Sequence, residues 1–98
     1  MPYIKINKRV IINNKINELL NNVSKMKFVE NEIVFDVEDG DINYIITRIL
    51  LAYLCGTNMS YKTLNSVIGI LECVKMELYR RVVEPYENKK IKDNGDVY

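Results

Sequence analysis

The spacing of apolar residues in the second half of the chain constrains the fold most. One set recurs every three or four residues, close to a heptad spacing: Leu64, Val67, Leu71, Val74, Leu78 and Val82. A second set lies beside it: Ile68, Met76, Tyr79 and Val83. This period places apolar side chains on one side of an α-helix, and heptads are typical of helices that pack on helices. We therefore predict a long helix over about 61–84, roughly 36 Å in length.

Two shorter helices are predicted before it. Residues at helical spacing indicate a helix over about 7–24: Ile12, Ile16, Leu19, Leu20 and Val23. A clearer set indicates a helix over about 42–55: Ile42, Ile45, Ile46, Ile49, Leu50, Tyr53 and Leu54. We expect Asp41 to cap this helix and Gly56 to end it in the left-handed conformation. Ser60 or Thr63 is the expected cap of the long helix.

Two segments interrupt the helical pattern. Residues 27–37 alternate apolar and polar side chains, and Glu30-Asn31 can turn a short β-hairpin. Pro85 lacks a donor and disfavours helical geometry before it, so the long helix should end or kink there. Residues 85–98 are then expected to form a C-terminal tail. The fold class is all-α: a single domain over 1–98, built as a three-helix protomer with a long C-terminal helix and a possible hairpin.

The long helix has more apolar surface than two short helices can cover. Gly69 in its middle costs about 1 kcal/mol relative to Ala, and close approach of another helix is the usual reason for such a glycine. Gly69 and Cys73 lie one turn apart and mark a plausible subunit contact. We therefore expect a homo-oligomer, either a dimer or a tetramer.

Composition excludes several classes of protein. Lys and Arg total 14 against 13 Asp and Glu, a net charge of +1, which argues against a DNA or RNA binder with a large basic face. The chain has no His, and Cys55 and Cys73 do not have the spacing of a zinc or redox motif. Without a glycine-rich phosphate loop or a nucleophile motif, we expect no enzyme, no metal and no cofactor. No signal peptide or membrane span is visible, so we expect a cytoplasmic protein.

Functional groups gather along the end of the long helix. Lys75, Tyr79 and Arg80 follow one another at steps of about one turn, with Arg81 adjacent and Tyr86 beyond the proline. Guanidinium groups clamp phosphate and aromatic rings stack on bases, so this set suits a nucleotide site. The alternative is that the arginines are exposed charges near a helix C-terminus.

Glu72 places a carboxylate in the second apolar set. A buried charge has to be paired, and Lys75 or Arg48 is the available partner. A carboxylate that contacts a ligand is the other interpretation. One carboxylate without a second acid at matching spacing is a poor case for catalysis.

The C-terminal run NSVIGILECVKMELYRRVVEPYENKKIKDNGDVY resembles a family of short tailed-phage proteins that open with MPYI and end on this motif. GDINYIITR at 40–48 also looks like the second helix of that family, whereas 25–38 looks like an insertion. In size, class and site chemistry the chain is similar to phage anti-CBASS and anti-Thoeris sponges, which sequester cyclic nucleotide immune signals without cleaving them.

This likeness implies a phage immune-evasion protein in the host bacterial cytoplasm, with a cyclic dinucleotide or related signal held in a pocket between subunits. The candidate ligand-binding residues are Tyr3, Lys75, Tyr79, Arg80, Arg81 and Tyr86. Two alternatives stay open. One is an adaptor or inhibitor that binds a host enzyme through the long helix. The other is a small nucleotide-processing enzyme, which would need Glu72 and Glu77 to collect a metal with acids from another subunit.

Overall fold

The computed structural model describes residues 2–23 and 26–98, in two compact units. One unit spans residues 3–57, and the other contains residues 58–98 together with Pro2. Met1 and residues 24 and 25 lie outside the described part, and with them the predicted last residue of the first helix and the first residue of the predicted insertion. The single domain predicted over 1–98 stays a prediction.

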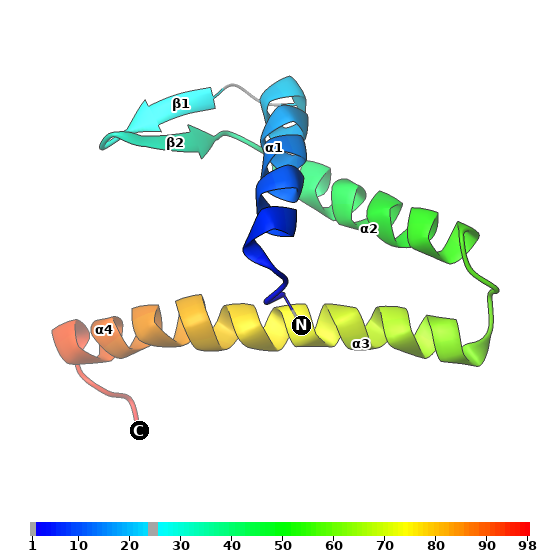
Figure 1. The fold of residues 1–98 in the computed structure, drawn as a ribbon. Coiled ribbons are helices and arrows are strands. Elements are labelled where there is room, and N and C mark those ends of the chain that lie inside the picture. Colours follow the sequence, from blue (N-terminus) through cyan, green and yellow to red (C-terminus); the bar gives the residue numbers. More distant parts are fainter. Residues whose placement is uncertain (1, 24–25) are drawn as a thin grey trace. The chain divides into compact units, whose positions relative to one another are not determined.

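The first unit contains two helices with a pair of strands between them (Figure 1). Helix α1 is Ile6–Val23, strands β1 and β2 are Met26–Val29 and Glu32–Phe35, and helix α2 is Asp39–Cys55. The strands are antiparallel, with Met26 opposite Phe35 and Val29 opposite Glu32. Their two-residue turn has positive φ at both Glu30 (52°) and Asn31 (66°), as the tight hairpin turns that match strand twist require.

Both ends of α2 differ from the prediction. The helix begins at Asp39, and its N-cap residue is Glu38, which makes no side-chain capping hydrogen bond, so Asp41 lies inside the first turn instead of before it. Gly56 has φ −84°, in the right-handed region, and its N–H donates to Ala52 O at 3.2 Å. The predicted left-handed glycine was wrong, because this helix ends by continuing its own bonding pattern for one more residue.

The cap of the next helix was predicted correctly. Helix α3 is Tyr61–Leu78, and Ser60 is its N-cap. The Thr63 N–H donates to Ser60 Oγ at 3.4 Å, and the Ser60 N–H donates to Thr63 Oγ1 at 2.9 Å. This reciprocal pair satisfies two backbone donors at the helix start, as in a capping box.

The long helix does not end at Pro85. A π-helical turn, η1 (Tyr79–Val83), follows α3, and helix α4 (Glu84–Asn94) continues from it as one ribbon (Figure 1). The Glu84 N–H donates to Tyr79 O, five residues back instead of four. A proline ring clashes with the carbonyl four residues before it, and the wider π-turn relieves that clash. The predicted tail is therefore helical through Asn94, and Gly95 (φ 90°) ends the helix.

The described residues are therefore all-α apart from the hairpin, with three helices if α3, η1 and α4 count as one. Of the side chains that the structure describes, only that of Val67 is buried. A Cβ added at Gly69 would meet no described atom within 4 Å, so the predicted subunit contact there stays a prediction. None of the helices in the described part of the chain combines the length and apolar character needed to cross a bilayer.

Candidate functional site

Five of the six predicted site residues lie on the long helix. Lys75 is in α3, Tyr79, Arg80 and Arg81 are in η1, and Tyr86 is in α4. Tyr3 precedes α1 and belongs to the other unit.

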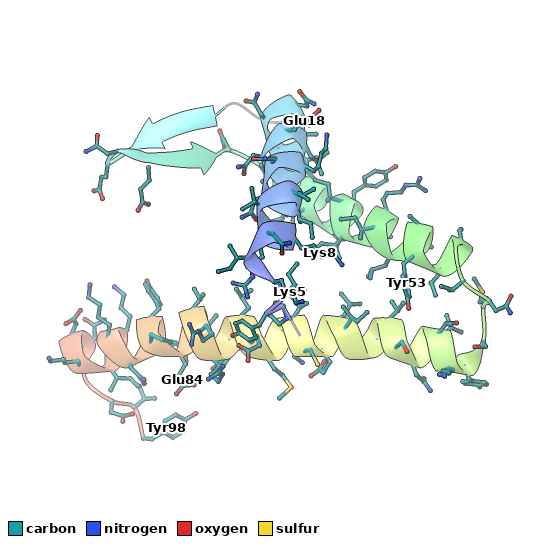
Figure 2. The ribbon with its side chains drawn as sticks, viewed as in Figure 1. Lys5, Lys8, Glu18, Tyr53, Glu84 and Tyr98 are labelled. Carbon is teal, nitrogen blue, oxygen red and sulfur yellow. The ribbon has the colours of Figure 1, made fainter. Side chains whose placement is uncertain are left out.

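A surface hollow of about 730 Å³ brings three of these residues together. Lys75, Tyr79 and Arg80 are among its lining residues, and the others are Cys73, Met76, Glu77 and Glu84. Glu84 projects from the first turn of α4 (Figure 2). Neither Arg81 nor Tyr86 is among the described residues that line it. The spacing of the functional groups therefore predicted three of the seven residues that line the hollow.

Arg80 is held by an acid that sequence reasoning did not include in the site. Its Nη2 donates to both carboxylate oxygens of Glu77, at 2.9 and 3.0 Å. The Glu77 side chain is only 22% exposed, whereas that of Arg80 is 61% exposed. The i, i+3 spacing was the available signal, because residues three apart are neighbours on a helix. The Arg80 guanidinium is thus hydrogen-bonded to a carboxylate, whereas we expected it to bind phosphate.

Lys75 is also paired. Its Nζ lies 2.9 Å from Glu72 Oε1, and both side chains are more than half exposed. The predicted pairing of Glu72 with Lys75 is therefore confirmed. The expectation that Glu72 is buried was wrong for this protomer, since the apolar set around it is itself exposed to solvent: Ile68 and Met76.

Tyr79 is held by an acid on α4. Its hydroxyl donates to Glu87 Oε2 at 3.3 Å. The charge of Glu87 and this hydrogen bond raise the pKa of Tyr79, with smaller contributions from desolvation and from Glu84. The phenol therefore stays protonated and remains a donor at neutral pH. Residues eight apart lie about 80° from each other around a regular α-helix, and the extra residue in η1 brings these two closer into line.

The two remaining predicted residues of the long helix differ in their surroundings. The Lys90 ammonium lies 5.5 Å from the centre of the Tyr86 ring, within the range of a cation–π contact. Arg81 has no ion-pair partner among the residues that the structure describes. Among the three cations of the predicted site, Arg81 is therefore the most available to a ligand.

Tyr3 lines a separate hollow within the first unit. This hollow of about 600 Å³ has six described lining residues: Tyr3, Ile4, Lys5, Asn7, Lys8 and Ile11. Lys5 and Lys8 lie at the start of α1 (Figure 2). The Arg9 Nε donates to Ile4 O at 2.5 Å, which ties the residues before the helix to its first turns.

The charges along 72–87 are nearly balanced. The cations are Lys75, Arg80 and Arg81, and the acids are Glu72, Glu77, Glu84 and Glu87. An anionic ligand at the hollow would therefore have to displace carboxylates from their cations. Within the described residues, no group of three or more His, Cys, Asp or Glu side chains could hold a metal ion.

A family model for a domain of unknown function, DUF6899, matches residues 1–97. The chain belongs to this family. No curated protein and no solved structure matches the chain. The match therefore identifies the family of the chain. The activity of the chain has to be argued from its residues.

Proposed function

We propose that this DUF6899 protein is a non-enzymatic binding protein that sequesters a cyclic nucleotide signal, such as a cyclic dinucleotide. The observation that supports the proposal is the hollow on α3 and η1, where Lys75, Tyr79 and Arg80 meet. Its volume of about 730 Å³ lies in the range of small-ligand sites. The resemblance to phage proteins supports a role in immune evasion inside the host bacterium.

In this proposal Arg80 exchanges Glu77 for a phosphate group. The Arg80–Glu77 pair lies at the surface on the arginine side, and such pairs contribute about 0–1 kcal/mol. A phosphate group offers more acceptor oxygens than one carboxylate and suits the forked geometry of the guanidinium, so we expect it to replace Glu77. The Tyr79 ring offers a stacking surface, and the Lys75 ammonium adds a further charge.

The other three predicted residues complete the site in a homo-oligomer, either a dimer or a tetramer. Arg81 and Tyr86 do not line the hollow of their own helix, and Tyr3 belongs to the other unit. A neighbouring copy supplies such residues in binding proteins whose site lies between subunits. A single protomer is then expected to bind its ligand only weakly.

Calorimetry against cyclic di- and trinucleotides and cyclic ADP-ribose isomers tests the proposal. The double variant Arg80→Ala and Arg81→Ala should weaken binding by at least about a hundredfold, since each lost charged hydrogen bond costs about 1.5–3 kcal/mol. Arg48→Ala removes an arginine from α2, in the other unit, and serves as the matched control. Glu77→Gln removes the competing carboxylate and should tighten binding. The proposal is rejected if no member binds below about 10 µM, which corresponds to roughly −7 kcal/mol.

A second candidate function is an adaptor that binds a host enzyme, and the exposed apolar side chains of the long helix favour it. A helix with an uncovered apolar face is suited to a groove in another protein. Mass spectrometry of the protein purified from infected cells distinguishes the two, followed by reconstitution of any complex from pure components. An intact nucleotide that co-purifies supports the sponge, whereas a host polypeptide that rebinds in pure form supports the adaptor.

A further inference from the structure

Glu84 is an acid of the hollow on the long helix that pairs with no described residue. The other three acids along residues 72–87 each have a partner: Glu72 with Lys75, Glu77 with Arg80, and Glu87 with Tyr79. Within the described part of the chain, Glu84 has no hydrogen-bond or ion-pair partner, and the residue is exposed. Its two carboxylate oxygens are therefore available as acceptors for a ligand.

The π-turn brings this carboxylate toward the side of the helix that carries Tyr79. Residues five apart lie about 140° from each other around a regular α-helix, and the wider turn of η1 reduces that angle. The charge of Glu84 reaches the phenol, because it is the smallest of the causes that raise the pKa of Tyr79. Lys75 precedes the ring along the helix, and Arg80 is next to it. The hollow thus has a cation before the ring, a second cation beside it and a carboxylate beyond it.

A carboxylate in this position suits a guanine base. Guanine presents two adjacent donors on its Watson–Crick edge, the ring N–H and the 2-amino group, and the two oxygens of one carboxylate can accept both. Adenine and cytosine each present an amino group beside a ring nitrogen that is an acceptor, which a carboxylate repels. Uracil presents a single donor between two carbonyl groups. Among these bases, guanine alone therefore satisfies both oxygens of the Glu84 side chain.

We infer that Glu84 selects a guanine base in the nucleotide that the hollow binds. The inference rests on the proposed function and narrows its ligand to cyclic nucleotides that contain guanine. In this arrangement the Tyr79 ring stacks on the base, and the carboxylate of Glu84 accepts from its Watson–Crick edge. Lys75 and Arg80 contact phosphate. Of the two acids that line the hollow in the described part of the chain, Glu84 is the one that a base can reach without displacing another contact.

Calorimetry with cyclic di-GMP and cyclic di-AMP tests the inference, because the two probes share one sugar–phosphate ring and differ only in their bases. We expect the wild-type protein to bind cyclic di-GMP at least about tenfold more tightly. Cyclic di-IMP, whose bases lack the 2-amino group, should bind less tightly than cyclic di-GMP.

The variant Glu84→Gln keeps the size of the side chain but replaces one acceptor with a donor. It should weaken the binding of cyclic di-GMP by at least about tenfold and should not weaken that of cyclic di-AMP. Gln has nearly the helix propensity of Glu, so the helical circular dichroism should persist. Asp93→Asn is the matched control and should keep the preference of the wild type, because it removes a negative charge from α4 at a residue that is not among those lining the hollow.

The sign of the effect separates base recognition from a purely electrostatic role. A carboxylate that only repels phosphate would, once neutralised, let both probes bind more tightly. Unchanged or tighter binding of cyclic di-GMP to Glu84→Gln therefore overturns the inference, and so does a control variant that loses the preference equally.

A wild-type protein that binds the two probes equally, or that prefers a ligand with adenine alone such as a cyclic ADP-ribose isomer, also overturns the inference. The proposed function then stands, because a cyclic nucleotide is still bound. If no cyclic nucleotide binds below about 10 µM, the proposed function fails and the inference fails with it.

Discussion

Replacing Pro85 by alanine should stabilise the long helix and remove its π-turn. A proline inside an α-helix costs about 3 kcal/mol or more, because its ring clashes with the carbonyl four residues back and it donates no hydrogen bond. The structure avoids part of this cost through η1, in which Glu84 bonds to Tyr79 O, five residues back. An alanine at this position removes the clash and restores a donor to Arg81 O. Both changes favour regular α bonding from Tyr61 to Asn94.

The net effect is smaller than the full proline cost. The π-turn already relieves the clash, and a proline restricts the unfolded chain in a way that contributes about 0.4–1 kcal/mol to stability. We therefore expect Pro85→Ala to raise the free energy of unfolding by about 1–2 kcal/mol, measured by urea denaturation. Pro2→Ala is the matched control, because Pro2 is the other proline of the chain and lies outside every helix.

A local measurement follows the π-turn itself. Without the π-turn Glu87 would lie about 80° around the helix from Tyr79. The pKa of Tyr79, which Glu87 raises, should then fall toward its ordinary value. NMR titration of ring-labelled tyrosine, assigned with Tyr79→Phe, measures this change. A variant that keeps both the raised pKa and the wild-type stability would show that Pro85 does not cause the π-turn.

Three further outcomes are expected. Ser60→Ala should lower the free energy of unfolding by about 1 kcal/mol, since the hydroxyl caps the first turn of α3, and urea denaturation measures it. Because the folded pKa of Tyr79 is raised by Glu87, the stability that their hydrogen bond contributes is present below the ordinary tyrosine pKa and lost as pH rises through the raised value. Tyr79→Phe should abolish this alkaline loss in melts from about pH 8 to 12. The double change Glu30→Asn and Asn31→Gly suits the positive φ of the hairpin turn and should increase hydrogen-exchange protection of the strand amides by up to about 1 kcal/mol.

Sequence reasoning succeeded where a structure depends on neighbours within one helical turn. The Ser60 cap and the Glu72–Lys75 pair join residues three apart, so spacing alone was sufficient to predict them. The expectation that the helix ends at Pro85 was wrong, because the rule that proline ends a helix assumes bonds between residues four apart. A π-turn uses hydrogen bonds between residues five apart. The only sign of it in the sequence is the spacing of the apolar residues after Leu78, which reach Val82 and then Tyr86 in two successive steps of four residues.

The candidate site shows the same division. Lys75, Tyr79 and Arg80 were predicted together because they lie about one turn apart, and the hollow brings them together. Glu77 could have been identified as the partner of Arg80 from its i, i+3 spacing. Glu87 could not, because its position over Tyr79 depends on the rotation that η1 introduces. The burial of the apolar residues on the long helix could not be predicted either, since an apolar stripe on one helix does not show which surface covers it.

The π-turn sets the phase of the helix at the proposed ligand site. It brings Glu87 to Tyr79 beside the hollow. A helix without this turn would separate Glu87 from the Tyr79 hydroxyl. Ligand binding should be weaker at protein concentrations below the dissociation constant of the oligomer, because the proposed site takes residues from a neighbouring copy.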